Sequence, residues 1–187
     1  GGGARTVADP EFDGVSHDIC SAVHPLALAS PFFAAYDLQA RGVRLSVPEI
    51  SYGNPMPDGP AAIGYRDIER TAAELSDGAS WRRLLGPLAA DCDGVVGLLL
   101  GDKRSLPPSI TAALKVAPRL LTQGSPLWGA LRGEDARALF TGVAAHTIST
   151  MPSLVSSGAG LMLATLGHAV GWPIPVGGSQ AIPDALI

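Results

Sequence analysis

Residues 153–170, SLVSSGAGLMLATLGHAV, are long enough for a helix and carry apolar or small side chains on every side. A helix without a polar face has to be buried all round. The sequence around it is uncharged as well, since no Lys, Arg, Asp or Glu lies between Arg137 and Asp184. We therefore expect a central helix that packs against other polypeptide, including segments outside this sequence. A membrane span is the alternative, which Thr165, His168 and several serines and glycines weaken.

Upstream of this stretch, the hydrophobic pattern changes between the strand period and the helix period. Residues 43–52 and 60–65 are typical of two strands, with Pro48 as a break or an edge and Asp58-Gly59 as the hairpin turn. Apolar residues then recur at helical spacing. Helices are expected from Ser30 to about Gln39, from Ile68 to Leu75, over residues 79–91, from Pro107 through Val116, and from Glu134 to about His146. The sequence therefore predicts an α+β fold that is mostly helical, with a small β-hairpin or antiparallel sheet and no βαβ repeat.

The composition excludes several classes of protein. Hydrophobic residues make up 47% of the 187 residues and charged residues 16%, which excludes a mainly disordered chain. The formal net charge is -4 and the Lys and Arg residues are scattered, so nucleic acid is not an expected partner. Cys20 and Cys92 are too few for a disulfide framework, and the first residues do not resemble a signal peptide. A cytoplasmic location is expected.

Common catalytic and nucleotide-binding motifs are missing or incomplete. Gly158-Ala159-Gly160 resembles the start of a dinucleotide fingerprint, but it falls inside the expected helix and the third glycine is missing. His17, Cys20 and His24 do not have the spacing of a known zinc finger, so a zinc site is only an alternative and no metal is expected. His168 is either a core histidine with satisfied hydrogen bonds or a pocket residue.

Two glycine-rich turns are candidate sites for an anionic or oxygen-rich ligand. Residues 1–6, GGGART, combine glycines, which let a backbone approach a ligand closely, with an arginine that can donate two hydrogen bonds to a phosphate. Residues 175–180, PVGGSQ, form a tight turn before an expected helix, where free N–H groups suit a ligand. Helix capping by Ser179 is the alternative explanation of the second turn.

Three segments, taken in order, resemble the phytoene dehydrogenase-like branch of the FAD-dependent oxidoreductases, which is related to the flavin amine oxidases. They are GGGART at residues 1–6, GVSHDICSAVHPL at residues 14–26 and HAVGWPIPVGGSQAI at residues 168–182. The resemblance extends over essentially all 187 residues, and the two longer motifs are the more specific ones.

The resemblance implies FAD as the cofactor. It implies that residues 1–6 pass the FAD pyrophosphate and that a segment beginning at Asp18 lies beside the isoalloxazine ring. The implied cofactor-binding residues are Gly1, Gly2, Gly3, Arg5, Thr6, Asp18, Ser21, Ala22 and Val23. The implied substrate-binding residues are His24, His168, Gly177 and Gly178. No catalytic acid or base is implied.

The same resemblance implies three parts of the chain. Residues 1–25 would be the edge of the FAD-binding domain, 26–172 a mainly helical substrate domain, and 173–187 the truncated return to the cofactor domain. The family's N-terminal Rossmann fingerprint, its ribose-binding acid and its C-terminal flavin-binding segment are not found in the sequence. We therefore expect an internal fragment of a two-domain FAD-binding fold, with the missing segments as its partners. The 187-residue chain alone is expected to be inactive.

In such an enzyme, hydride or electrons would pass from a hydrophobic substrate, for example an isoprenoid, to FAD, and the protein would orient both. Peripheral contact with a membrane is compatible with such a substrate. A binding or interaction module without a cofactor and without catalysis is the alternative. A membrane-inserted protein or a zinc-binding protein is a further alternative.

Overall fold

The computed structural model describes residues 3–57, 59–102, 104, 109–125 and 129–187. The chain forms two compact units: unit 1 consists of Gly1–Pro48 and Gly171–Ile187, and unit 2 consists of Glu49–Val170. The fold is α+β, mostly helical with small antiparallel sheets, as the sequence predicts. Asp58, Pro107 and Pro108, expected at a turn and at a helix start, lie outside the described residues.

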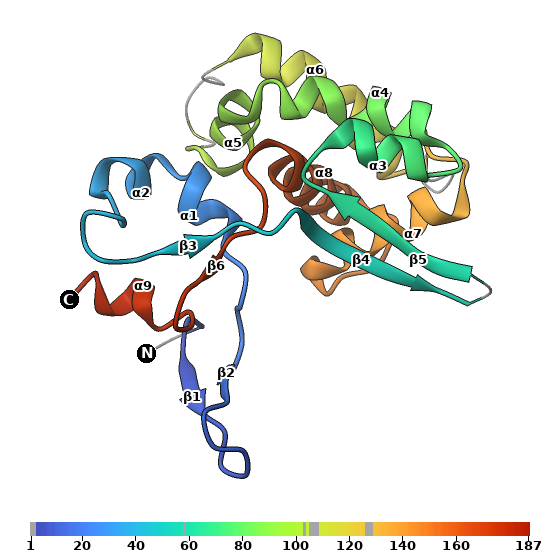
Figure 1. The fold of residues 1–187 in the computed structure, drawn as a ribbon. Helices are drawn as coiled ribbons and strands as arrows, with labels where there is room; N and C mark the ends of the chain where they lie inside the picture. The colour runs from blue at the N-terminus through green and yellow to red at the C-terminus, as the bar shows by residue number, and fades with distance from the viewer. Residues whose placement is uncertain (1–2, 58, 103, 105–108, 126–128) are drawn as a thin grey trace. The chain divides into compact units, whose positions relative to one another are not determined.

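Unit 1 joins two segments that are far apart in the sequence. Its elements are β1 (Thr6–Ala8), β2 (Ser16–Asp18), α1 (Pro25–Ala29), α2 (Pro31–Tyr36), β3 (Leu45–Ser46), β6 (Ile174–Pro175) and α9 (Ala181–Asp184). Strands β1 and β2 form an antiparallel hairpin, and β3 pairs antiparallel with β6, with Leu45 opposite Pro175 (Figure 1). The Tyr36 hydroxyl adds a second link, since it donates a hydrogen bond of 2.6 Å to the carbonyl oxygen of Ala185.

The core of unit 1 is small and draws on both segments. Partly buried Phe33, Tyr36 and Leu45 pack against a cluster of four buried side chains, Ala27, Leu38, Val43 and Ile182. Residues 1–25 and 173–187, which the resemblance assigns to the cofactor domain, therefore lie in one unit, together with residues 26–48.

Unit 2 consists of a β-hairpin and a group of helices. Its elements are β4 (Ile50–Met56), β5 (Gly59–Tyr65), α3 (Ile68–Glu74), α4 (Gly78–Ala89), α5 (Cys92–Leu100), α6 (Ile110–Gln123), α7 (Glu134–Ala144), the 3-10 turn η1 (Ala145–Thr147) and α8 (Leu154–Ala169). Helix α8 is central, with contacts to α4, α5, α6, α7 and β5 (Figure 1).

Several elements of unit 2 follow directly from the sequence pattern. The face of α4 that carries Trp81, Leu84, Leu85 and Leu88 is buried, with each of these side chains at most 3% exposed. Pro48 interrupts the expected strand 43–52, because β3 ends before it and β4 begins after it. The apolar residues 94–100 belong to α5.

Apart from the exposed Leu154 and Val155 in its first turn, helix α8 packs against other elements of unit 2. Leu161, Ala164 and Leu166 are fully buried, and a Cβ atom added to Gly160 would lie only 2.8 Å from Cζ of Phe140 in α7. The apolar composition of residues 153–170 therefore does not require polypeptide from outside the sequence, contrary to our expectation. In the part of the chain that the structure describes, no helix has the length and apolar character needed to cross a membrane.

Candidate functional site

The N-terminal hairpin of unit 1 holds several of the residues singled out by the sequence. Thr6 lies opposite Asp18 in the register of β1 and β2, and its Oγ1 donates a hydrogen bond of 2.6 Å to Oδ1 of Asp18. The pairing continues past both strands, since the backbone N–H of Ser21 donates to the carbonyl oxygen of Gly3 at 3.1 Å. Residues 3–6 and 18–21 are therefore held side by side.

The glycine turn near the end of the chain closes onto this hairpin. The backbone N–H of Ser179 donates to Oδ1 of Asp18 at 2.8 Å, and that of Gln180 donates to Oγ1 of Thr6 at 3.0 Å. Gly178 has φ +101°, and a Cβ atom there would lie 2.3 Å from Oγ1 of Thr6. The glycine is therefore explained by close packing within the chain.

Ser179 and His24 extend the contact. The Ser179 side chain is fully buried, and its Oγ lies 2.6 Å from the carbonyl oxygen of Ser21 and 2.8 Å from Nε2 of His24. The hydroxyl has one proton, which must go to the carbonyl oxygen because that oxygen cannot donate. His24 therefore donates through Nε2. A serine hydroxyl whose proton is committed in this way, and which is buried, is not poised as a nucleophile.

We call this group the Asp18 network; it consists of Thr6, Asp18, Ser21, His24, Ser179 and Gln180. Within it, burial alone would raise the pKa of Asp18, but hydrogen bonds from Thr6 and Ser179 and the nearby His24 lower it below its ordinary value. Burial lowers the pKa of His24, against the opposing effects of Ser21 and Asp18. At neutral pH the network therefore contains an ionised carboxylate and a neutral imidazole.

Sequence reasoning found only part of the Asp18 network. The sequence predicts Ser179 only as a possible helix cap and Gln180 only as part of a glycine-rich turn, yet their backbone N–H groups bind Asp18 and Thr6. The cap of α9 carries no side-chain hydrogen bond. The Gly177-Gly178 turn indicates free N–H groups in the residues that follow it. The sequence does not indicate their acceptors, Asp18 and Thr6, because these lie far away along the chain.

Arg5 and Gly3 are exposed residues among those expected to bind the cofactor. The side chain of Arg5 is exposed, and no acidic side chain of the described ranges forms an ion pair with it. Gly3 is exposed, with open space where a Cβ would lie. Both features fit an anionic group beside the hairpin. Gly1 and Gly2 lie outside the described residues.

The other expected site residues of unit 1 lie close to the network. Ala22 is exposed and Val23 is half-buried, and both follow Ser21 in the segment between β2 and α1. Gly177 has φ +88° with open space around its Cβ position. Gly177 therefore has free space beside it, whereas the space beside Gly178 is filled by Thr6.

His168 belongs to unit 2, where its ring is held by two partners. Nε1 of Trp81 donates to its Nε2 at 2.9 Å, and its Nδ1 lies 3.4 Å from the carbonyl oxygen of Arg66. The indole N–H can only donate, so Nε2 accepts and the proton of the neutral ring is on Nδ1. Burial lowers the pKa of His168, against the effect of the Arg66 carbonyl. This is the arrangement of a satisfied core histidine.

A cavity of about 470 Å³ lies in unit 1 beside α1 and α2. Apolar side chains and the polar residues Asp37, Gln39 and Arg44 line it, and Arg44 has no acidic partner among the described residues. Its volume is within the range of small-molecule sites. The lining residues are Ala27, Leu28, Phe33, Ala34, Asp37, Leu38, Gln39, Val43, Arg44, Leu45 and Val47.

The described residues offer no metal centre. No group of three or more His, Cys, Asp or Glu side chains in these ranges is placed to hold a metal ion. His17, one of the zinc candidates, bonds to Asp9 through Nε2, and this bond is the largest cause that lowers the pKa of Asp9. Cys20 and Cys92 are both free thiols.

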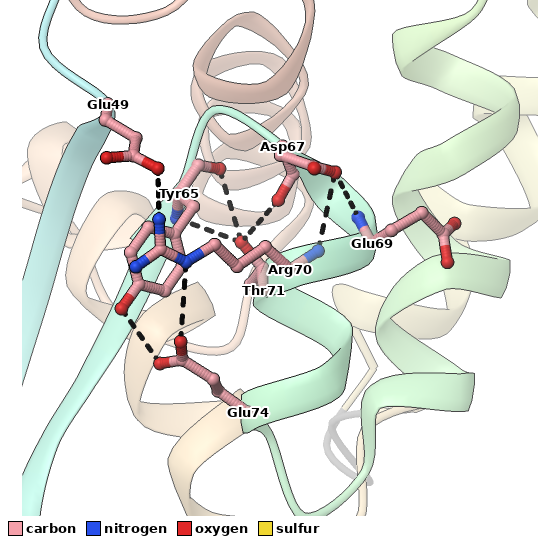
Figure 2. Close-up of polar contacts among 7 residues, drawn as sticks. All are labelled: Glu49, Tyr65, Asp67, Glu69, Arg70, Thr71 and Glu74. Atoms are coloured by element: carbon pink, nitrogen blue, oxygen red, sulfur yellow. Dashed lines mark hydrogen bonds and ion pairs between the residues drawn. The ribbon is translucent and has the colours of Figure 1, made fainter.

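A second polar group lies in unit 2 where β5 leads into α3 (Figure 2). Arg70 lies over the Tyr65 ring at 3.9 Å and pairs with both Glu49 and Glu74. The Tyr65 hydroxyl donates to Glu74 at 2.9 Å, a bond that raises the pKa of Tyr65. The acids are thus neutralised within the group, which indicates a structural role.

Hydrogen bonds between residues close in sequence fix the start of α3 and its contact with the end of β5. Asp67 accepts hydrogen bonds from the backbone N–H groups of Glu69 and Arg70, and so caps α3. The buried Thr71 hydroxyl lies within hydrogen-bond distance of the backbone N–H and carbonyl groups of Tyr65 (Figure 2).

Comparisons of the chain with protein-family models, with curated proteins and with solved structures found no significant match.

Proposed function

We propose that the chain is part of an FAD-dependent oxidoreductase of the phytoene dehydrogenase-like type, acting on a hydrophobic substrate. The observation that carries the proposal is the Asp18 network. It joins residues 6–24 to residues 179–180 of the same unit, and these belong to the motifs on which the resemblance depends. Segments that bind one cofactor have to lie close together in the fold. The hydrogen bonds of the Asp18 network hold these two segments together, which supports the proposal.

The residues of unit 1 would have two different tasks toward FAD. Arg5 and Gly3, both exposed, would bind the pyrophosphate, with Gly1 and Gly2 as further candidates from the sequence. Thr6, Asp18 and Ser21 would act by bracing the hairpin, because their polar atoms are already engaged within the protein. Bound FAD would supply the redox chemistry, accepting hydride or electrons from the substrate.

The cavity of unit 1 is the candidate pocket for the hydrophobic substrate. Apolar side chains such as Phe33, Leu38 and Val43 line it, and Arg44 is available for a polar end group. His24, Gly177 and the other expected substrate residues are not among its lining residues. Substrate contact at those positions remains an expectation from the resemblance.

Titration of the isotopically labelled 187-residue protein with FAD, followed by NMR, tests the cofactor proposal. Weak binding is expected, because the sequence has no dinucleotide fingerprint. The amide signals of residues 3–6 and 21–23 should shift. Arg5→Ala should weaken binding about tenfold, equivalent to about 1.4 kcal/mol. Arg137→Ala, which removes an exposed arginine of unit 2, is the matched control.

Three outcomes would contradict the cofactor proposal. They are an absence of shifts in residues 3–6 and 21–23, shifts confined to other parts of the chain, and an equal loss of binding in Arg5→Ala and Arg137→Ala. The last outcome would indicate a nonspecific charge effect, since both substitutions remove one positive charge.

The cavity also favours a second function, a module that binds a lipophilic ligand without redox chemistry. Ala34 is exposed and lines the cavity, whereas its neighbour Ala35 is exposed and does not line it. Ala34→Trp should therefore block binding of the isoprenoid alcohol farnesol, and Ala35→Trp should leave it unchanged. Farnesol binding without any FAD response would favour the module over the oxidoreductase. If Ala34→Trp bound farnesol as well as the unmodified protein, the cavity would not be the site.

A further inference from the structure

Helix α6 of unit 2 has two apolar faces. Ala112, Val116 and Gln123 form the inner face and are at most 2% exposed. Ile110, Leu114 and Leu121 on the opposite side are 74%, 71% and 63% exposed. Ala117, also exposed, lies between the two leucines. We call these four outward residues the α6 seam; they are Ile110, Leu114, Ala117 and Leu121.

The spacing within the α6 seam is that of a helix–helix contact. The four positions are separated by four, three and four residues, which is the a/d pattern of a heptad repeat. Such a seam is one residue wide on each turn, and narrower than the apolar face of a helix that lies in a membrane interface. At 1.5 Å per residue it extends about 16 Å along the helix. A second amphipathic helix is therefore the partner that it fits.

The apolar surface continues beyond the C-terminal end of α6. A Cβ atom added to Gly124 would lie 3.0 Å from Cδ2 of Leu154, which is 51% exposed. The adjacent Val155 is 67% exposed. Exposed apolar groups that adjoin one another indicate an interaction surface more strongly than isolated ones.

The charge around α6 indicates the nature of the partner. Between Asp102 and Glu134 the sequence has no Asp or Glu but contains five of its 13 Lys and Arg residues, in a chain whose net charge is -4. On α6 itself, Lys115 pairs with Asp91 at 2.7 Å. Arg119 donates to the backbone carbonyls of Leu84 and Arg83 and has no carboxylate partner among the described residues, so its positive charge is not balanced. A second copy of α6 would carry the same positive charges and would be repelled.

We propose that the α6 seam is the docking surface for an acidic amphipathic helix of a partner protein. The leucines of the seam would insert between apolar residues of that helix, and acidic residues at its flanks would face the positive charge around α6. The proposal is independent of the flavin proposal, because the α6 seam contains none of the residues assigned to FAD or to the unit 1 cavity.

Two synthetic peptides test the docking surface. Both are labelled helices with Leu at heptad positions a and d; one carries Glu and the other Lys at positions e and g. Fluorescence anisotropy should show the 187-residue protein binding the Glu peptide at least tenfold more tightly than the Lys peptide, with affinity falling as salt rises. Leu114→Glu and Leu121→Glu should each weaken the binding tenfold or more.

Ile148→Glu is the matched control, because Ile148 is 96% exposed and lies outside the seam. It should bind the Glu peptide as the unmodified protein does, and circular dichroism should show all three variants folded. Equal binding of the two peptides, or no binding of either, would overturn the proposal. Leu114-dependent binding to vesicles of phosphatidylserine and phosphatidylcholine, with no peptide binding, would identify a membrane surface instead. Leu114-dependent dimers in sedimentation would identify a second copy.

Discussion

Trp81 and His168 hold each other in one arrangement through a hydrogen bond and a ring contact. The rings meet edge to face with their centroids 5.9 Å apart, and the indole N–H requires an unprotonated Nε2 on the histidine. A second proton on the imidazole would place two donors against one another. Burial also lowers the pKa of His168, so it favours the same unprotonated Nε2 that the indole N–H requires.

The protonation of His168 predicts a loss of stability in acid. A histidine whose pKa is lower in the folded state contributes stability above its unfolded pKa of about 6.5, and this stability is lost as pH falls through the folded pKa. The protection factors of the α8 amides, which correct for the slower intrinsic exchange in acid, should therefore fall between about pH 7 and pH 5.

His168→Gln is the control for this pH effect. The glutamine amide can accept from Trp81 and donate to Arg66 without titrating. The fall in the α8 protection factors should be smaller in the variant, while the protection of unit 1 near His24 should keep its own pH dependence. An unchanged fall in α8 would show that His168 is not the titrating group.

At the scale of the element, α8 depends on small residues at contacts with its neighbours. Alanine is favoured over glycine in a helix interior by about 0.5–1 kcal/mol, so a glycine persists most readily where a methyl group does not fit. A Cβ atom at Gly160 would lie 2.8 Å from Phe140 and 3.1 Å from Ala144, whereas one at Gly158 would meet only Leu120 at an ordinary 3.6 Å.

Two substitutions in α8 should therefore have opposite effects. Gly158→Ala should raise the free energy of unfolding by about 0.5–1 kcal/mol through helix propensity. Gly160→Ala should lower it by about 1–3 kcal/mol, because fully buried Phe140 has little room to move. Urea denaturation of both variants measures the difference. Stabilisation of the same size at both positions would show that the α7–α8 contact is loosely packed.

The elements differ in how far the sequence determined them. Helix α4 could be predicted because Trp81 and the three leucines repeat at helical spacing, which is a local signal. For α8 the sequence correctly indicated burial but not the source of the cover, since a helix that is apolar all round does not specify its neighbours. The pairing of β3 with β6 could not be predicted, because strands of two residues carry no period.

At the scale of the whole molecule, the two units differ in how the chain builds them. Unit 2 is one continuous segment with α8 at its centre, whereas unit 1 needs residues 1–48 and 171–187 together. The Asp18 network was beyond sequence reasoning for this reason. Thr6, Asp18 and the glycine turn each belong to a motif of the sequence, but no local pattern shows that the Asp18 carboxylate accepts from the backbone N–H of Ser179.

Residues 49–170 alone are predicted to fold. Their core is formed within the segment, so circular dichroism should show a helical protein with a cooperative urea transition. A second variant that ends at residue 170 should keep unit 2 but lose the protection of residues 3–48 from hydrogen exchange. A non-cooperative transition for residues 49–170 would show that unit 2 depends on unit 1.

The split construction of unit 1 also has a consequence for biosynthesis. Ribosomes release the N-terminal end first, so the β1–β2 hairpin and residues up to 48 emerge long before Ser179 and Ile182 exist. During that interval Leu38 and Val43 lack their neighbour Ile182, so the core of unit 1 is incomplete. Unit 2 is one continuous segment and can fold before residues 171–187 are made. Synthesis of residues 171–187 would then decide when unit 1 becomes resistant to proteases.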